Sequence, residues 1–286
     1  MMRRDGLPND HVPEVSADPS ALARGFAKGV LNPRVTNWRG QRVWLVGASS
    51  GIGEALARAL LDRGARIALS ARRVESLQAL ASPAQERCVV LPLDVTDATA
   101  VKAATSALLE AWGGIDLVVW LAGTYAPMRA DQFDLAVARQ MLDINLGAVY
   151  NGLDALLPIL FAQRGGGIAL VSSVAGYRGL PRALAYGPSK AGLNNLAESL
   201  WLDLHPRGIG VWLINPGFVS TPLTEKNDFQ MPAIITTDQA AQHIIRGLES
   251  GGFEIHFPRR FTLWMKLLRI LPTRLCFAVL RRMTGG

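Results

Sequence analysis

Seven short apolar runs, separated by segments of helical periodicity, dominate the chain from residue 41 onward. The runs cover residues 43–46, 66–69, 88–91, 117–121, 168–171, 211–214 and 253–257. The helix-period segments lie at 52–63, 98–111, 134–160, 187–204 and 238–249. Strands that are apolar throughout and alternate with amphipathic helices are typical of a parallel sheet covered on both faces. The sequence therefore predicts an α/β fold, a doubly wound parallel sheet of about seven strands flanked by helices.

The chain divides into three regions by composition and charge. Residues 1–40 contain four prolines and little periodicity, which indicates an N-terminal extension. Residues 41–257 hold the alternating strands and helices. Residues 258–286 form a basic amphipathic tail with seven Lys and Arg side chains and no Asp or Glu, equal to the formal net charge of +7. Because the charge is gathered in one segment, we predict no nucleic-acid-binding surface spread over the fold.

The composition excludes several classes of protein. Hydrophobic residues make up 49% of the 286 residues, which supplies a large core and argues against intrinsic disorder. No apolar run reaches the roughly 18 residues of a membrane-spanning helix, and no apolar signal segment follows the basic N-terminus. Cys88 and Cys276 lie in no CxxC or Cys/His cluster. The sequence therefore predicts no metal site and a cytoplasmic location, where thiols stay reduced.

A glycine-rich turn joins the first predicted strand to the first predicted helix. It reads Gly47-Ala48-Ser49-Ser50-Gly51-Ile52-Gly53. Glycines let the backbone turn tightly and approach a pyrophosphate at a helix N-terminus. Taken alone, the motif fits a plain turn equally well. The strand before it and the helix after it, closed by Gly64, favour a dinucleotide site.

The residues after the second predicted strand favour one dinucleotide. An NAD site places Asp or Glu about 20 residues beyond the glycine turn, where the carboxylate holds the ribose 2′-hydroxyl. This chain has Arg72 and Arg73 there. A guanidinium suits the 2′-phosphate of NADP through paired charged hydrogen bonds. We therefore predict that Arg72 binds NADP(H); the alternative is a solvated arginine pair on a loop.

Polar side chains in the second half of the chain form a candidate catalytic set. Tyr186 and Lys190 lie four residues apart at the start of a predicted helix, so they share one face. A phenol acts as general acid near neutral pH when an adjacent ammonium group stabilises its phenolate. The preceding strand ends at Ser173, which we prefer to Ser172 on spacing. Asn145 is a polar residue in an apolar helix; its alternative role is bonding to backbone.

Together these motifs resemble the short-chain dehydrogenase/reductase family, in its short single-domain branch with GxxxGxG glycine spacing. The resemblance covers residues 41–257 and implies a Rossmann-like fold and an NADP(H)-dependent oxidoreductase that reduces a ketone or aldehyde. It implies that Tyr186 donates a proton to the substrate carbonyl oxygen, while Lys190 holds the nicotinamide ribose and lowers the pKa of Tyr186. It further implies that Ser173 hydrogen-bonds to the carbonyl oxygen and that Asn145 holds a water linking Lys190 to solvent.

The resemblance also implies a set of cofactor-binding residues. Asp94 would lie beside the adenine, although it has the alternative role of starting the next helix. The segment from Pro216 to Thr221 would grip the nicotinamide amide. The full implied set is Gly47, Ser49, Ser50, Gly51, Ile52, Gly53, Arg72, Asp94, Val95, Ala122, Gly123, Tyr186, Lys190, Pro216, Gly217, Val219 and Thr221.

The chain departs from the family pattern at two neighbouring places. Val46 precedes the first glycine where the family has Thr, and Trp120-Leu121-Ala122-Gly123 replaces Asn-Asn-Ala-Gly. Both changes put apolar side chains where polar ones are usual. Removing both partners of a buried polar contact is nearly neutral, whereas removing one is costly. We therefore interpret the two changes as paired repacking that leaves activity intact.

An apolar substrate is predicted from the region after the nicotinamide segment, which forms a movable lid in the family. The predicted pocket residues are Phe229, Met231, Ile234, Ile235, Tyr125, Tyr177 and Leu180. They favour an apolar, lipid-like carbonyl compound or alcohol. The rival function is a non-catalytic NADP-binding sensor or a membrane-associated scaffold. The Tyr186 phenol argues against this alternative, because cofactor binding alone does not require a phenol. The resemblance also implies a homo-oligomer, formed through the helix that carries Ala191, Gly192, Leu196 and Leu200.

The basic tail has two interpretations. Phe261, Trp264, Leu267, Leu268 and Leu271 fall on one helical stripe, with Thr262, Lys266 and Arg269 opposite. A basic amphipathic helix with an interfacial Trp suits the anionic inner face of a membrane, as a peripheral contact. Alternatively, the tail packs over its own pocket or over a partner subunit, with its arginines in water.

Overall fold

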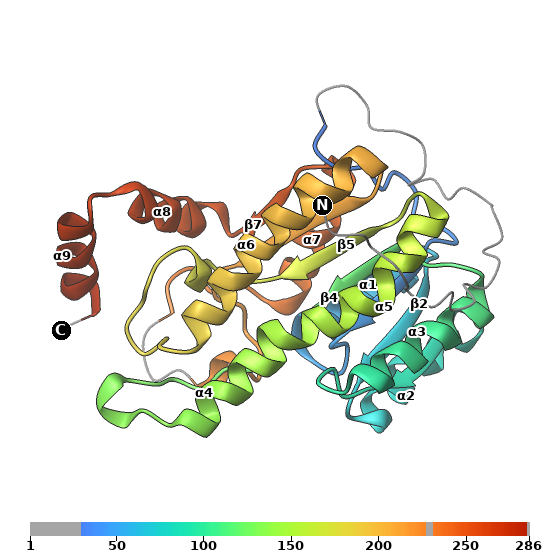
Figure 1. Ribbon diagram of the computed structural model, residues 1–286, viewed down its shortest axis with the longest axis horizontal. Helices are drawn as coiled ribbons and strands as arrows, with labels where there is room; N and C mark the ends of the chain where they lie inside the picture. Colours follow the sequence, from blue (N-terminus) through green and yellow to red (C-terminus); the bar gives the residue numbers. More distant parts are fainter. Residues whose placement is uncertain (1–29, 227–230, 285–286) are drawn as a thin grey trace, which may run out of the picture.

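A single parallel sheet forms the centre of the molecule (Figure 1). The computed structural model describes residues 30–226 and 231–284. The strands are β1 (Arg42–Val46), β2 (Arg66–Ala71), β3 (Cys88–Pro92), β4 (Leu117–Trp120), β5 (Gly167–Val171), β6 (Gly210–Pro216) and β7 (Glu254–Phe257). They pair in the order β3-β2-β1-β4-β5-β6-β7, all parallel. The prediction of a doubly wound parallel sheet of seven strands is confirmed.

Helices cover both faces of this sheet. They are α1 (Gly51–Asp62), α2 (Val74–Ala81), α3 (Ala98–Trp112), α4 (Leu135–Leu142), α5 (Ala148–Gln163), α6 (Tyr186–Leu204), α7 (Thr237–Ser250), α8 (Arg259–Ile270) and α9 (Thr273–Thr284). The sequence did not predict α2, because two turns are too short to establish a helical period. The helix predicted at 134–160 is interrupted by a π-helical turn at Asp143–Gly147.

Alternating side chains of the strands build a core on each face. Val43 and Leu45 of β1 pack with α1, α2 and α7. Trp44 and Val46, which point the other way, pack with α3, α5 and α6. Figure 1 looks onto the layer of α3, α5 and α6, with α1 and α7 behind the sheet. Because both faces are covered, strands that are apolar throughout are the expected sequence pattern.

From β1 the chain builds the sheet first in one direction, through β2 and β3, and then in the other, from β4 to β7. The strand order therefore reverses at β1, between β2 and β4. At such a point the connections leave for opposite faces of the sheet and open a crevice at the carboxyl ends of the strands, where ligands bind in folds of this kind. The amide of Leu121 donates to the carbonyl of Val46 at 2.7 Å, and the amide of Gly47 donates to that of Ser70 at 2.7 Å. These bonds fix the crevice walls.

The described end of the N-terminal extension is attached to the body. The side-chain amide of Asn32 donates to the carbonyl of Val211 at 2.6 Å, and its oxygen accepts from the amide of Val211 at 2.9 Å. The indole of Trp38 donates to Glu249 at 2.9 Å. The first 29 residues of the predicted extension lie outside the described residues. The three-region division of the chain stays a prediction.

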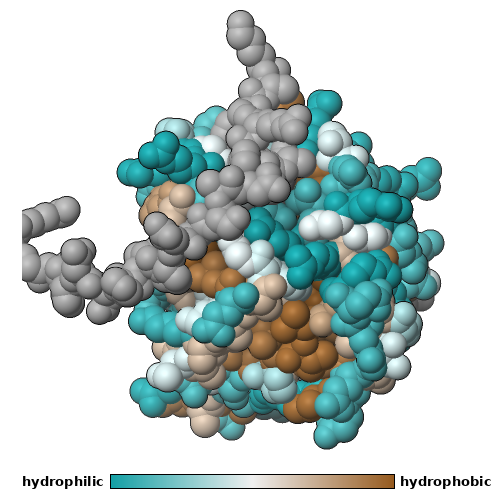
Figure 2. Space-filling view, turned by 90° about the vertical axis from the view of Figure 1, so that its right-hand side faces the viewer, coloured by the Kyte–Doolittle hydropathy of each residue, from teal (hydrophilic) through white to brown (hydrophobic). Residues whose placement is uncertain are grey.

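The basic tail folds into α8 and α9 at one end of the molecule (Figure 1). Met265, Leu268, Cys276 and Leu280 form a small core with Val174 and other residues that follow β5. Of the apolar stripe predicted for α8, Phe261, Leu268 and Leu271 pack in this core, whereas Trp264 and Leu267 are exposed. Thr262 is fully buried and bonds to His256 at 2.6 Å, whereas Trp264 is 41% exposed. The end opposite the tail, seen in Figure 2, is mostly hydrophilic around a smaller apolar area.

One continuous helical stretch, Leu135–Gln163, is long and apolar enough to span a membrane, with half of its most apolar window buried. It comprises α4, the π-helical turn and α5. Gly152 of α5 lies so close to β4 that a Cβ there would be 2.3 Å from the Trp120 ring. We interpret this stretch as a core helix of the sheet layer.

Candidate active site

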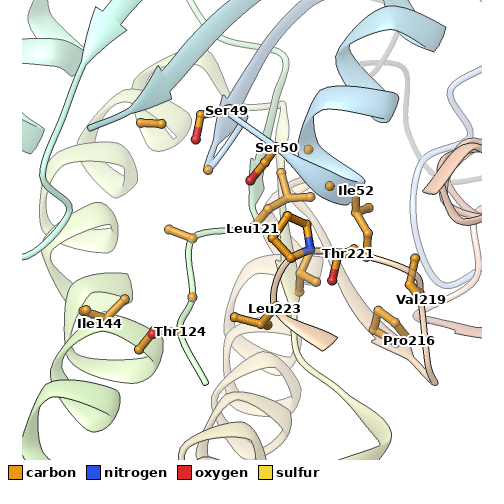
Figure 3. Close-up of a pocket in the computed structure, with 18 of the residues that line it drawn as sticks. Ser49, Ser50, Ile52, Leu121, Thr124, Ile144, Pro216, Val219, Thr221 and Leu223 are labelled. Carbon is orange, nitrogen blue, oxygen red and sulfur yellow. The ribbon is translucent and has the colours of Figure 1, made fainter. Parts of the chain in front are cut away.

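A cavity of about 550 Å³ lies at the carboxyl ends of β1 to β6, within the size range of small-molecule sites. Figure 3 shows Ser49 and Ser50 near the start of α1, with Pro216 at the end of β6 and Val219 and Thr221 in the segment after it. Every implied cofactor-binding residue lines this cavity, as do Ser173, Tyr186 and Lys190. Asn145 does not line it.

At the glycine turn the cavity is lined by backbone atoms without side chains. Gly47 has φ +103°, and a Cβ there would lie 2.6 Å from the amide nitrogen of Ala122. A Cβ on Gly53 would lie 2.3 Å from the Gly47 carbonyl oxygen. Ser50 caps α1 without any side-chain hydrogen bond, so the first-turn amides stay available for an anion. These features fit the pyrophosphate of a dinucleotide.

Two arginines stand at the end of β2. Arg72 and Arg73 both line the cavity and are exposed. One guanidinium nitrogen of Arg73 donates to the backbone and hydroxyl oxygens of Ser49, each at 3.2 Å. Arg72 alone was predicted to bind the cofactor; Arg73, its neighbour in the sequence, carries the same guanidinium group and could have been included on that basis. No carboxylate follows β2 directly, since the next acidic residue is Glu75 inside α2.

Asp94 lies across the same end of the cavity. Its carboxylate accepts from the amide of Thr96 at 3.0 Å and from the hydroxyl of Thr96 at 2.7 Å. These hydrogen bonds, with a smaller contribution from Arg72, lower the pKa of Asp94. The cap of α3 is Asp97, which accepts from the amides of Thr99 and Ala100. Asp94 therefore shapes the turn before the helix and is not its cap.

Tyr186, Lys190 and Ser173 meet on one side of the cavity. Tyr186 begins α6, and Lys190 follows one turn later. The Lys190 ammonium donates to the carbonyl of Val171 at 2.9 Å and lies 5.7 Å from the Tyr186 ring centre. Ser173 hydrogen-bonds to the Tyr186 hydroxyl, and its oxygen also accepts from the amide of Ala175 at 3.1 Å. One strand end and one helix start thus supply all three groups.

Burial controls the protonation of this cluster. It raises the pKa of Tyr186 to about 12, although the hydrogen bond from Ser173 opposes the rise. It lowers the pKa of Lys190 to about 8. Both shifts follow from the cost of burying a charge. At neutral pH the phenol is therefore protonated. The resemblance implied that Lys190 lowers the pKa of Tyr186, but the pKa lies above its usual value, because desolvation is the larger effect.

Asn145 lies fully buried in the π-helical turn. Its oxygen accepts from the amide of Thr124 at 2.7 Å, and its nitrogen donates to the carbonyl of Thr124 at 3.0 Å and to the hydroxyl of Ser189 at 3.1 Å. A Cβ on Gly123 would lie 3.3 Å from the Asn145 oxygen and 3.6 Å from the Lys190 nitrogen. Asn145 thus ties the turn after β4 to α6, next to Lys190.

The remaining lining residues were not assigned from the sequence. They are Ala71, Arg73, Leu93, Leu121, Thr124, Ile144, Val171, Ser172, Pro222, Leu223 and Thr224. The Ser172 hydroxyl donates to the backbone carbonyl of Lys190 at 2.8 Å, so its proton is engaged in a structural hydrogen bond. Thr224 closes the turn after β6 by donating to the carbonyl of Val219 at 2.7 Å. No sequence motif marks most of these positions, since they reach the cavity only through the fold.

The residues predicted to line the substrate pocket are placed differently. Tyr125 stacks edge-on against Tyr186, with ring centres 5.0 Å apart. Tyr177 donates to Glu254, and Leu180 packs against the tail helices. Neither these residues nor Met231, Ile234 and Ile235 line the described cavity, whose apolar surface instead includes Ile144 and Leu223. Phe229 lies outside the described residues.

Across residues 30–226 and 231–284, no group of three His, Cys, Asp or Glu side chains is arranged to hold a metal ion.

Comparison with known proteins assigns the family. A family model described as short chain dehydrogenase matches residues 41–231. An uncharacterized oxidoreductase from Myxococcus xanthus is 38% identical over 84% of this chain and 96% of its own length. A short chain dehydrogenase from Burkholderia cenocepacia, solved in complex with NADP, aligns with a TM-score of 0.76 and 25% identity over 85% of this chain and 98% of that one. Because the family match covers residues 41–231, from the first strand to beyond Thr224, the chain belongs to the short-chain dehydrogenase family of oxidoreductases.

Proposed function

We propose that the protein is an NADP(H)-dependent reductase of an apolar ketone or aldehyde, and reversibly a dehydrogenase of the corresponding alcohol. The observation that carries the proposal is the convergence of Ser173, Tyr186 and Lys190 on a cavity that also contains the glycine turn. The Burkholderia cenocepacia relative, solved with NADP, supports the choice of a nicotinamide cofactor.

The glycine turn and the first-turn amides of α1 would hold the pyrophosphate. Ser49, Arg72 and Arg73 surround the position after β2 where the ribose phosphate of NADP belongs. Pro216 and Thr221 on the opposite wall would face the nicotinamide. When bound, the cofactor supplies the hydride. Two guanidinium groups, with no carboxylate directly following β2, favour a phosphate over a free 2′-hydroxyl.

In the reaction, the protonated phenol of Tyr186 gives its proton to the carbonyl oxygen of the substrate. With substrate bound, the Ser173 hydroxyl, which neighbours the same phenol, turns its single proton to that oxygen and stabilises the charge that develops on it. The Lys190 ammonium, held by the Val171 carbonyl, holds the ribose and favours loss of the phenolic proton. Asn145 keeps the turn after β4 in register with α6, so that Lys190 stays in position.

Ile144 and Leu223 support an apolar substrate, because both present aliphatic carbon to the cavity. The proposal also includes a cytoplasmic location, in keeping with the free thiols of Cys88 and Cys276. We also propose that the protein assembles into a homo-oligomer through α6.

The test is oxidation of NADPH and NADH by the purified protein with aldehydes and ketones of increasing chain length. We expect turnover that prefers NADPH and rises with chain length. Tyr186→Phe should lose about two to four orders of magnitude in turnover and still bind NADPH, because only the proton donor is removed. The exposed Tyr150→Phe is the matched control. Tight NADPH binding without turnover on any carbonyl would favour the non-catalytic sensor or scaffold.

Removing the guanidinium of Arg72 or Arg73 should weaken the binding of NADPH about ten- to hundredfold and leave the binding of NADH unchanged, because only NADPH carries the extra phosphate. Arg58→Ala, on the exposed face of α1, serves as the control for loss of positive charge. A wild-type preference for NADH would contradict the assignment of Arg72.

A further inference from the structure

Helix α8 has two apolar faces, and the fold uses only one of them. Met265 and Leu268 are buried against the residues that follow β5. Leu263, Leu267 and Ile270 lie at i, i+4 and i+7 on the other side and are 55%, 43% and 77% exposed. This outer stripe is uncovered within the described chain.

The outer stripe continues a concentration of exposed apolar side chains over both tail helices. Of fifteen large hydrophobic residues exposed in the described chain, six lie between residues 263 and 277. They are Leu263, Trp264, Leu267, Ile270, Leu275 and Phe277. Apolar residues scattered singly over a surface need no explanation, but a cluster of this kind marks an interaction site.

The charge around this surface has one sign. Residues 258–286 contain seven Lys and Arg side chains and no Asp or Glu. Lys266 is paired with Glu254 at 2.6 Å. The exposed Arg260, Arg274 and Arg281 take part in no ion pair within the described chain. The partner of this surface must therefore supply negative charge as well as an apolar phase.

We propose that the outer faces of α8 and α9 dock the protein onto an anionic lipid bilayer. Leucine, isoleucine and tryptophan side chains enter the boundary between headgroups and acyl chains, and the arginines contact the anionic headgroups. A second copy related by a two-fold axis would bring the same arginines together and repel them. A nucleic acid would match the charge and leave the aliphatic stripe in water.

The docking surface is joined directly to the site. Phe261, on the inner side of α8, packs against Phe218 in a tilted arrangement, with ring centres 5.4 Å apart. A Cβ on Gly217 would lie 2.8 Å from the same Phe261 ring. Val174, which packs beneath α8, follows Ser173 in the chain. Docking would therefore set the bilayer beside the loops that line the cavity.

The experiment is co-sedimentation of the full chain with vesicles of phosphatidylcholine, alone or mixed with phosphatidylglycerol. We expect binding to the mixed vesicles that is at least about tenfold stronger than to phosphatidylcholine alone and that weakens with added salt. A variant carrying Leu263→Ser, Leu267→Ser and Ile270→Ser should lose this binding by about tenfold or more. Replacing Arg260, Arg274 and Arg281 by Gln should weaken the preference for anionic lipid, because about half of the tail's positive charge is removed.

The matched control carries Phe133→Ser, Leu135→Ser and Tyr150→Ser, which are 55%, 52% and 54% exposed and lie outside the tail and α6. It should bind vesicles like the wild type. Equal binding by the stripe variant and the wild type, or no binding of the wild type to anionic vesicles, would overturn the proposal. So would a stripe variant that only changes the oligomeric state, since this would identify a second copy as the occupant. Vesicle binding is read without turnover, so failure of the reductase proposal would not affect this test.

Discussion

At the scale of single residues, the site depends on ionisable groups that are partly or fully removed from solvent. Lys190 is buried and Tyr186 is partly buried, and desolvation moves their pKa values in opposite directions, toward the neutral form of each. Their one-turn spacing follows from the sequence. Their protonation follows from the surrounding structure, because desolvation depends on what packs over them.

Lys190 should make the stability of the protein depend on pH. Its pKa is about 8 in the folded protein, against an ordinary value of 10.5. The folded state therefore releases this proton first, and stability should rise as the pH increases from about 8 to about 10.5, by on the order of 3 kcal/mol. Lys190→Met should lack this rise in urea unfolding across the range. The exposed Lys102→Met should keep it; an identical rise in Lys190→Met would show that other groups cause it.

Val46 tests the pairing of the two departures from the family pattern. Val46 is fully buried, is the cross-strand partner of Trp120, and shares a core cluster with it. Val46→Thr would add a hydroxyl to an apolar contact, so the free energy of unfolding should not increase. Chemical denaturation measures this directly. A gain of more than about 1 kcal/mol would mean that the site lacks a polar partner and that the changes are not paired.

At the scale of elements, close packing between α5 and β4 fixes one wall of the site. The absence of a side chain on Gly152 lets the helix lie against the Trp120 indole. The same stretch of helix carries the π-helical turn that places Asn145 beside α6. A shift of α5 would therefore also displace Asn145 and its contact with α6, the helix that carries Tyr186 and Lys190.

Gly152→Ala should destabilise the protein by about 1–3 kcal/mol, because the new methyl group would overlap the Trp120 ring. Gly147→Ala, in the same helical stretch, is the control. Gly147 has helical φ and ψ, and its nearest atom to a new Cβ is 3.7 Å away. That substitution should be neutral or stabilising by up to about 1 kcal/mol. Thermal unfolding of both variants gives the comparison, and equal effects would rule out the proposed contact.

At the scale of the whole molecule, a polar cluster attaches the tail to the sheet. Glu254 of β7 accepts hydrogen bonds from Tyr177 and from Asn215, the latter at 2.8 Å, and pairs with Lys266 of α8. Burial alone would raise the pKa of Glu254, but these partners outweigh it and lower the pKa. One carboxylate thus joins the tail to β6 and to the segment that follows β5.

Because its folded pKa is lowered, Glu254 should stabilise the protein above the ordinary glutamate pKa of 4.5 and lose this effect as the pH falls below it. Glu254→Gln should be less stable at pH 7 and show a smaller loss on acidification. Hydrogen exchange should locate the change in α8. Glu54→Gln, in an exposed pair on α1, should change stability by less than about 1 kcal/mol. Unchanged exchange in α8 would contradict the attachment.

The strands, the glycine turn and the positions of Ser173, Tyr186 and Lys190 could be predicted because local patterns encode them. A strand buried on both faces must be apolar throughout, and a turn against another backbone requires glycine. The approach of Gly47 to Ala122 shows that second requirement in space. Such constraints leave the same mark in any chain that folds this way.

Tertiary structure alone decided the rest. Arg73 reaches Ser49, Asn145 reaches Ser189, and Leu223 reaches the cavity across long stretches of chain. The tail is the clearest case, since α8 carries two apolar stripes and periodicity cannot choose between them. The residues after β5 cover the stripe with Met265 and leave Leu263 exposed. Sequence periodicity records which residues share a face of a helix, whereas burial depends on the surface that the rest of the fold presents to it.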